Sequence, residues 1–194
     1  MTAGADIPLA CRCGSVTGTL HDVRPRDGTH VVCHCNACAR AMALSGLGEE
    51  AAAGVDLWQT TPDRIEIVTG MDQLVPMRLS PRGLFRWTAR CCDTPMFNTF
   101  AGPRLPFAGV LTRNLSDPAP LGPVIAHGFV TGADGKQRHR HGHRVVWRFV
   151  RRSLAARMTG RWRQTPFFDA DGQPVNAPFC FRARTPRANL PSPR

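Results

Sequence analysis

Residues 33–38, Cys-His-Cys-Asn-Ala-Cys, place three cysteines within six positions and decide how the rest of the chain is interpreted. Thiolates this close in sequence converge on one point, and a soft divalent metal, most often zinc, occupies such a point in proteins. The alternative, three cysteines that only pack in a core, fits this spacing less well. No fourth ligand lies nearby in sequence, and three protein ligands with one open position are typical of a reactive zinc. We therefore predict a metal site at Cys33, Cys35 and Cys38 that also carries the chemistry.

Two further cysteine motifs lie on either side of this stretch. Cys11 and Cys13 form a C-x-C motif, and Gly14 after them allows a tight turn around a metal. Cys91 and Cys92 are adjacent, and two neighbouring cysteines rarely both bind one ion with good geometry. The four sulfurs are candidate ligands of a second, structural zinc. Of the adjacent pair, Cys92 is the stronger candidate, and whether Cys91 also binds the metal is left open. His34 alternates away from its cysteine neighbours on an extended segment, so we place it beside the site rather than on the metal.

The cysteine pattern also bears on the compartment. Adjacent and C-x-C cysteines make poor disulfide frameworks, because neighbouring sulfurs do not easily reach the required geometry. Residues 1–10 carry no secretory signal, and no run approaches the ~20 apolar residues of a membrane span. Metal binding in the reducing cytoplasm, with no membrane span, is the prediction.

The charge is divided unevenly along the 194 residues. Residues 1–100 hold nine arginines against ten acidic residues, whereas residues 101–194 hold sixteen basic residues against four aspartates. Such asymmetry favours an anionic partner for the second half: nucleic acid, a membrane surface or an acidic small molecule. A solvated basic surface with no specific partner is the alternative.

Short alternating segments with turn residues between them predict a mainly β fold of antiparallel strands in residues 1–115. The expected strands are Gly14–Leu20, Thr29–Cys33, Asp56–Thr61, Arg64–Thr69, Gly83–Ala89, Pro95–Phe100 and Leu105–Leu111. A helical turn is expected over Ala37–Leu44.

Residues 116–194 form a predicted basic C-terminal extension with a proline-rich loop at 115–124, a helix at about 145–158 and a disordered tail at about 182–194. The helix carries one apolar stripe, Val146, Phe149/Val150, Leu154 and Met158. We expect this stripe to pack on the β domain with the arginines in water, unless the basic helix lies on DNA or lipid.

The motif order C-x-C-G, then C-H-C-x-x-C, then C-D-T-P resembles the glutathione-dependent formaldehyde-activating enzyme family, which includes centromere protein V. The resemblance covers about residues 8–115. It implies a β-tent fold, two zincs, and carbon–sulfur chemistry on glutathione adducts. The implied reactive zinc is held by the 33–38 cysteines. The implied structural zinc is held by Cys11, Cys13, Cys92 and position 89, which is Ala89 here. Three possibilities follow: Cys91 replaces the missing ligand, or the zinc has three protein ligands, or the site holds no zinc. Asp93 replaces the family's glycine and tolerates the same left-handed backbone better than most residues.

Three functional hypotheses remain open. The first is a zinc protein with one or two ions that acts as a carbon–sulfur lyase on adducts such as S-hydroxymethylglutathione, with arginines binding its carboxylates. The second is a non-enzymatic zinc module that binds nucleic acid through its arginine-rich half. The third is a structural or redox-labile zinc protein. His139, His141 and His143 alternate and are a minor metal candidate beside a solvated basic loop. Cys180 has no Cys or His neighbour and is predicted to be an idle thiol.

Overall fold

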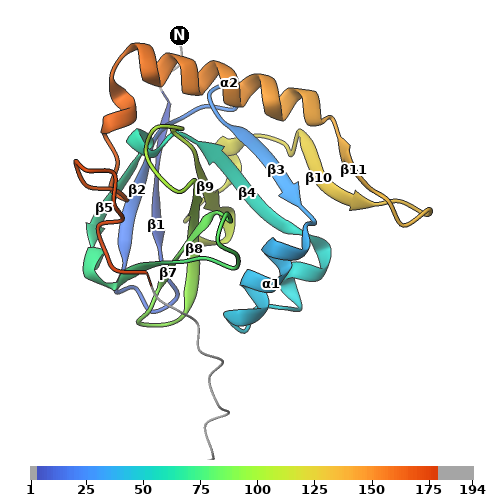
Figure 1. Cartoon of the computed structure of the whole chain (residues 1–194), viewed down its shortest axis with the longest axis horizontal. Coiled ribbons are helices and arrows are strands. Elements are labelled where there is room, and N and C mark those ends of the chain that lie inside the picture. Colours follow the sequence, from blue (N-terminus) through green and yellow to red (C-terminus); the bar gives the residue numbers. More distant parts are fainter. Residues whose placement is uncertain (1–3, 179–194) are drawn as a thin grey trace, which may run out of the picture.

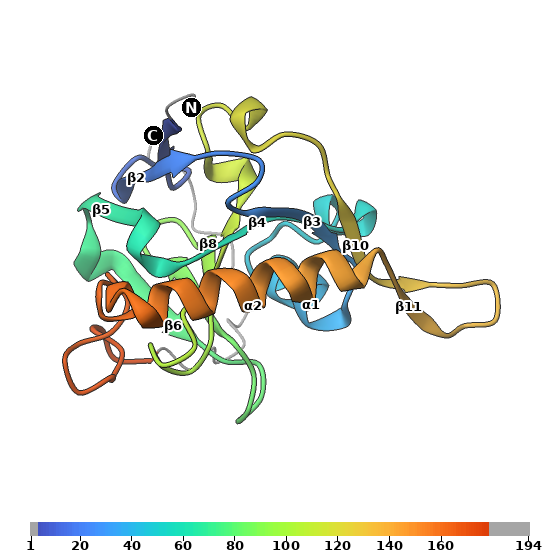
Figure 2. The same cartoon turned by 90° about the horizontal axis from the view of Figure 1, so that it is seen from above.

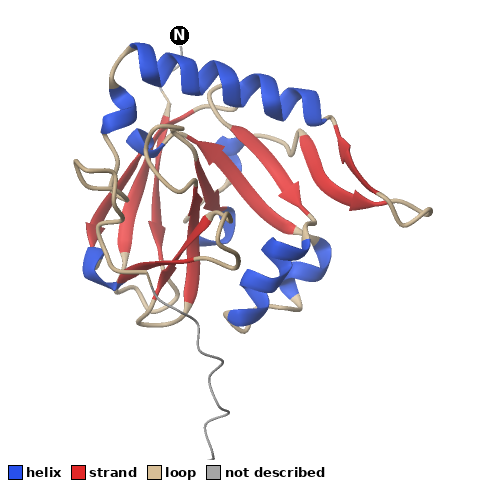
Figure 3. Ribbon diagram, viewed as in Figure 1, coloured by secondary structure: helices blue, strands red, loops and turns tan. Residues whose placement is uncertain are grey.

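The computed structural model describes residues 4–178, and these fold mainly into strands. The strands are β1 (Ala5–Ala10), β2 (Thr17–Val23), β3 (Thr29–Cys33), β4 (Val55–Thr60), β5 (Ile65–Thr69), β6 (Leu74–Met77), β7 (Phe85–Ala89), β8 (Thr94–Thr99), β9 (Ala108–Leu111), β10 (Ala126–Thr131) and β11 (Gln137–Arg140). Two α-helices accompany them, α1 (Asn36–Leu44) and α2 (Gly142–Met158). Figure 3 shows α2 running along one side of the strands, with α1 near the end of the strand that leads into it. The predicted mainly β fold with one long helix in the second half is confirmed.

The strands form two sheets. A three-stranded sheet has the order β1-β2-β5, and an eight-stranded sheet has the order β11-β10-β3-β4-β9-β8-β7-β6. All pairings are antiparallel except that of β10 with β3, which is parallel. Four strands were not predicted from the sequence: β1, β6, β10 and β11. The basic and glycine-containing segments of β10 and β11 alternate poorly. The larger sheet therefore includes strands from both halves of the chain (Figure 1).

The main core lies between the sheets. Trp58, Trp87 and Phe97 are almost fully buried there, together with residues from β1, β2 and β5. The chain returns to this core after α2: the ring centroids of Phe167 and Phe168 lie 5.0 and 6.0 Å from that of Trp87. Aromatic side chains bury large apolar areas and prefer such tilted contacts, so the last described segment helps to hold the sheets together.

The helix α2 runs along the top of the molecule as seen in Figure 1 and across its front in Figure 2, and it contacts β3, β4 and β10. Its orientation corrects the sequence prediction. Val146, Leu154 and Met158 are 61%, 57% and 79% exposed, whereas Arg152 and Ala156 are buried. Most of the apolar stripe therefore faces solvent. Only Phe149 of that stripe packs inward, against Phe100 and Phe107 in the loop between β8 and β9.

The reason is the segment between β2 and β3, which offers backbone carbonyls to the helix. Arg148 donates to the carbonyl oxygens of Pro25 and Gly28 at 2.7 and 2.9 Å, and Arg151 donates to that of Arg26 at 2.8 Å. Backbone carbonyls near a packed surface need donors, and guanidinium groups supply several each. Hydrogen bonds to the β2–β3 loop, rather than burial of the apolar stripe, therefore determine which face of α2 contacts the β domain.

The strands on either side of Thr61-Pro62-Asp63 lie in different sheets, β4 in the larger one and β5 in the smaller one. A short 3₁₀ turn at Pro62–Arg64 carries the chain from one sheet to the other. The predicted tail at 182–194 lies outside the described residues. Within residues 4–178, neither helix has the length and apolar character that crossing a membrane requires.

Candidate metal centres

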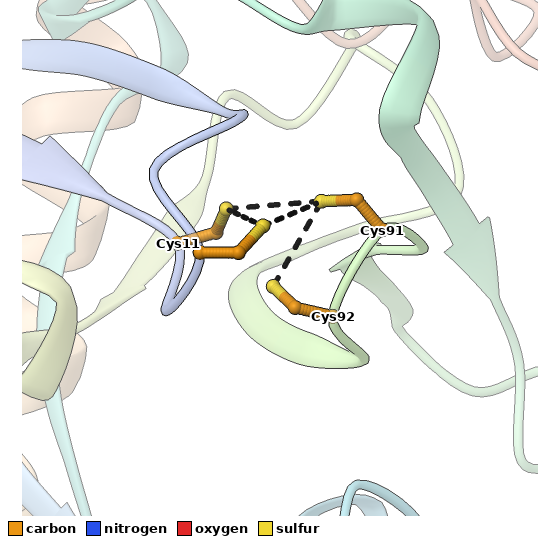
Figure 4. A group of neighbouring side chains, drawn as sticks. Cys11, Cys91 and Cys92 are labelled. Carbon is orange, nitrogen blue, oxygen red and sulfur yellow. Dashed lines mark hydrogen bonds between the residues drawn. The ribbon is translucent and has the colours of Figure 1, made fainter. Parts of the chain in front are cut away.

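The loops that follow β1 and β7 bring four sulfur atoms together. The Sγ atoms of Cys11, Cys13, Cys91 and Cys92 all lie within 4.8 Å of one another. The separations include 3.4 Å for Cys13–Cys91, 3.6 Å for Cys11–Cys13, and 3.8 Å for Cys11–Cys91 and for Cys91–Cys92 (Figure 4). A tetrahedral zinc with Zn–S bonds of ~2.3 Å separates its sulfurs by about 3.8 Å. We call these residues the four-cysteine group, and their geometry could hold a metal ion.

Local backbone geometry explains why these loops present sulfur. Gly14 has φ +78°, which lets the chain reverse after the first pair, and Asp93 has φ +55° in the tight turn before β8. Aspartate therefore adopts the left-handed conformation expected of the residue that replaces glycine. The backbone N–H of Arg12 donates to Thr94 Oγ1 at 3.2 Å, and its guanidinium donates to the Cys92 carbonyl oxygen at 2.8 Å. These two hydrogen bonds fasten one loop to the other.

Position 89 is not part of this group. Ala89 is fully buried at the end of β7, paired with Thr94 and Leu74 on the adjacent strands. The fourth sulfur comes instead from Cys91, two residues later. The sulfur of Cys91 therefore lies in the group to which the resemblance would assign a sulfur at position 89.

The thiols of the four-cysteine group have opposed proton affinities. Hydrogen bonding to Ser15, and then to Cys91, lowers the pKa of Cys13 to about 6. Burial, reinforced by the neighbouring thiols, raises the pKa of Cys91 to about 12. One thiolate is thus already favoured near neutral pH, and a cation would favour loss of the remaining protons.

The second group lies where β3 ends and α1 begins. The Sγ atoms of Cys33, Cys35 and Cys38 lie within 4.8 Å of one another, and they are half-buried or buried. Cys35 is the N-cap of α1, and its sulfur accepts a hydrogen bond from the Cys38 backbone N–H at 3.3 Å. A helix N-terminus favours negative charge, so this position favours a thiolate. Hydrogen bonds from the other two thiols also hold the pKa of Cys35 far below its usual range.

A buried arginine touches this three-cysteine group. Arg86, on β7, is 6% exposed, and its Nη1 donates to Cys38 Sγ at 3.4 Å and to Asn98 Oδ1 at 2.9 Å. A buried guanidinium needs a compensating charge, and the contact with sulfur supplies one when the cysteines are thiolates. Arg86 was not among the residues predicted from the sequence, because an arginine in an alternating strand is normally assigned to the exposed face.

The three-cysteine group opens into a cavity of about 670 Å³, which we call the thiolate cavity. Its wall is mostly apolar. The apolar residues of the wall include Leu57, Leu84, Phe100, Phe107, Phe129 and Val145. Cavities of this size, lined by apolar groups with a few polar ones, are the usual form of a small-molecule site.

Two histidines meet beside this cavity. His34 Nε2 lies 3.3 Å from His127 Nδ1, and the rings are stacked with centroids 5.6 Å apart. His127, on β10, also lines the cavity. His34 is not in the three-cysteine group, and it contacts a residue of the cavity wall. His127 was missed, because nothing in the sequence indicates that β10 pairs with β3.

The remaining sequence candidates lie elsewhere. His139 lines the thiolate cavity and packs on Phe129, with ring centroids 4.5 Å apart. Strand β11 ends before His141, and His143 is already in α2, so the three histidines do not share a strand face. Within residues 4–178, the two groups of side chains able to hold a metal are the two cysteine groups. Cys180 lies outside the described residues.

The fold and its two cysteine groups define a mainly β protein with the capacity to hold metal ions. The chain belongs to a family of unknown function, DUF6151, whose model matches residues 4–176. No curated protein matches it. Among solved structures, a Rhodobacter sphaeroides structural genomics protein is similar at 19% identity and a TM-score of 0.41, over 60% of this chain and 96% of that one.

Proposed function

We propose that this protein is a zinc enzyme that acts on adducts between a thiol and an aldehyde and cleaves their carbon–sulfur bond. The observation that carries the proposal is the convergence of Cys33, Cys35 and Cys38 in the wall of a large apolar cavity. Three sulfur ligands leave a tetrahedral zinc one position for a substrate, and the cavity provides the space for it.

The motif order supports the same chemistry. Its resemblance to the glutathione-dependent formaldehyde-activating enzymes rests on the cysteine spacing, and the β-tent fold and two-zinc content of that family belong to the proposal. The four-cysteine group is the counterpart of the structural zinc, with Cys91 in the role of the missing ligand. The proposal requires a reducing compartment such as the cytoplasm, because both groups need free thiols.

Zinc held by the three cysteines would supply a Lewis acid and a binding position for a thiolate. The side chains around the zinc would balance its charge and position the reacting groups. Three thiolates and one divalent cation carry a net charge of −1, and the guanidinium of Arg86 against Cys38 balances it inside the protein. Asn98 holds that guanidinium in place.

The reaction balances without any redox partner. In an S-hydroxyalkyl thiol, the carbon–sulfur bond breaks, its electron pair stays on sulfur, and the hydroxyl group loses its proton to give the aldehyde. His127 is the base that we assign to this proton, because its ring lies in the cavity wall and is oriented by contact with His34. The reverse direction forms the adduct with the same groups.

The apolar lining of the thiolate cavity indicates which substrates would bind best. Formaldehyde adds a single carbon and needs no apolar space, whereas Phe100, Phe107 and Leu84 offer a surface for a hydrocarbon group. Adducts with an apolar aldehyde or an apolar thiol are therefore favoured over S-hydroxymethylglutathione. Arg82, also in the wall, is placed to pair with a carboxylate if glutathione is the thiol.

Binding of nucleic acid by the arginine-rich half is the alternative, and it stays a prediction. Arg148, Arg151 and Arg152 donate hydrogen bonds to the β domain, so part of the donor capacity of α2 is used within the protein and not for a nucleic-acid backbone. Steep loss of DNA or RNA affinity with added salt would favour this alternative.

The test is NMR exchange spectroscopy of glutathione mixed with formaldehyde or with phenylacetaldehyde, with and without the purified protein. We expect faster exchange between adduct and free aldehyde, with the larger acceleration for phenylacetaldehyde. Cys35→Ser should abolish it, and Cys180→Ser, which changes the cysteine outside the three sequence motifs, should preserve it. Full activity of Cys35→Ser, or no acceleration with either aldehyde, contradicts the proposal.

A further inference from the structure

A second cavity, of about 260 Å³, lies between α2 and the β domain, away from both cysteine groups. Its wall is unusually rich in arginine. Five of the lining residues are Arg24, Arg64, Arg151, Arg152 and Arg161, and the acidic lining residues are Asp22 and Asp27. The lining side chains therefore carry an excess of positive charge. We call this cavity the arginine cavity.

The acidic residues of this region are already paired. Asp22 accepts from Arg64 at 2.6 Å and from Arg24 at 2.7 Å, and Asp63, just outside the cavity, accepts from Arg161 at 2.7 Å. Within residues 4–178, no ion pair involves Arg151 or Arg152. Two of the five guanidinium groups thus lack a counter-charge.

Arg152 is the exceptional member. It is 9% exposed, and its Nη1 donates to Thr29 Oγ1 at 2.7 Å. Its Nε and Nη2 are buried and have no hydrogen-bond partner in the described structure, and the same holds for Arg24 Nε. Buried donors are normally satisfied, and a buried charge normally has a partner. Orphan donors in a positively charged wall indicate a missing acceptor.

Neighbouring charges make this arrangement more costly still. Burial, followed by the positive charges of Arg148 and Arg151, lowers the pKa of Arg152 to about 10, while Asp27 opposes this only weakly. Burial and its arginine neighbours also lower the pKa of Arg148. The helix α2 is therefore held on the β domain by cations that repel one another, and an anion between them would relieve the repulsion.

We propose that the arginine cavity binds a small oxyanion with two or more negative charges, of the size of pyrophosphate or a tricarboxylate. Guanidinium groups bind the oxygens of phosphates and carboxylates in paired hydrogen bonds, so both classes share the recognition chemistry. The volume suits one such group and excludes a long polymer as the sole occupant. The bound anion would join Arg151 and Arg152 of α2 to Arg24 and Arg64 of the β domain, and so hold the two together.

Isothermal titration calorimetry of the full chain tests this, with pyrophosphate and with citrate as probes and sodium chloride at matched ionic strength as the control. We expect one equivalent of at least one probe to bind and to raise the melting temperature, and the probe that binds identifies the oxyanion class. Arg152→Met should weaken binding at least 10-fold, and Arg151→Gln, an exposed position, should weaken it less. The matched control Arg140→Met, on β11 outside the cavity, should bind as the wild type does.

The variants also separate binding from folding. Arg152→Met removes an uncompensated buried charge, so the free protein should keep its stability, as its melting temperature without probe will report. If that variant fails to fold, the affinity of Arg151→Gln for the probe alone decides whether the anion binds in the arginine cavity. Absence of binding by either probe at millimolar concentration, or equal affinity in the wild type and the folded cavity variants, overturns the proposal.

Discussion

The sulfur atoms of Cys13 and Cys91 lie 3.4 Å apart although 78 positions separate the two residues in sequence. The contact joins the β1–β2 loop of the smaller sheet to the β7–β8 loop of the larger one. A metal at this point would therefore tie the two sheets together at one end of the core.

Replacing Cys91 by serine should remove one metal equivalent and destabilise the chain. Its sulfur lies within 3.8 Å of each of the other three, and loss of one ligand weakens a structural site strongly. Each 1 kcal/mol shifts the melting temperature of a chain of this size by about 2–4 °C, so we expect a fall of several degrees. Calorimetric melting of Cys91→Ser and of the control Cys180→Ser measures this, and equal melting temperatures would count against the site.

Arg86→Gln should weaken metal binding at the three-cysteine group by roughly 10–100-fold, the range typical of residues that support a metal ligand from behind. The change removes the positive charge beside Cys38 and keeps a hydrogen-bonding amide. Competition with a chromophoric chelator measures the affinity. Arg40→Gln, an exposed position on α1, is the matched control, and an Arg86 variant that holds metal as tightly as this control would show that the guanidinium does not balance the site.

The orientation of α2 predicts that two substitutions two residues apart change the free energy of unfolding by different amounts. Leu154→Gln lies on the solvent side and should change the free energy of unfolding by no more than about 0.5 kcal/mol. Ala156→Leu inserts a larger side chain at a fully buried position and should cost about 1–3 kcal/mol. Urea denaturation compares them. The reverse order would mean that the helix buries its apolar stripe after all.

His21 predicts a pH dependence of stability. Hydrogen bonds to Glu66 on β5, and then to Asp6 on β1, raise the pKa of His21 above 6.5 in the folded protein. The folded state therefore binds this proton more tightly than the unfolded state, so the stabilisation is complete below pH 6.5 and is lost as the pH rises through the folded-state pKa.

Urea unfolding at pH 6 and pH 8 tests the link. Relative to His21→Gln, the wild type should lose stability between these two values, by a small amount because all three side chains are substantially exposed. Parallel curves for the two proteins would show that the histidine carries no such linkage.

Much of the fold and of the sites follows from local sequence. The spacing of Cys33, Cys35 and Cys38 fixes their convergence, because a strand end and the first turn of a helix place i, i+2 and i+5 close together. The alternating segments predicted β3 at its observed bounds, Thr29–Cys33, and six other strands to within a few residues, but they did not predict β1, β6, β10 or β11.

What local sequence could not supply is long-range pairing. The role of Cys91 depends on where the β7–β8 turn meets the β1–β2 loop, and that of His127 on the parallel pairing of β10 with β3. The orientation of α2 depends on carbonyl groups 120 residues away. The division of the chain at residues 115 and 116 stays a prediction, with β10 and Phe167 bridging it in space.

The most direct test of the central claim is the zinc content of freshly purified protein, measured by elemental mass spectrometry against chain concentration. We expect two zinc ions per chain, and one when Cys33, Cys35 and Cys38 are all changed to serine. Wild-type protein free of transition metal, or a triple variant with undiminished metal content, would contradict it.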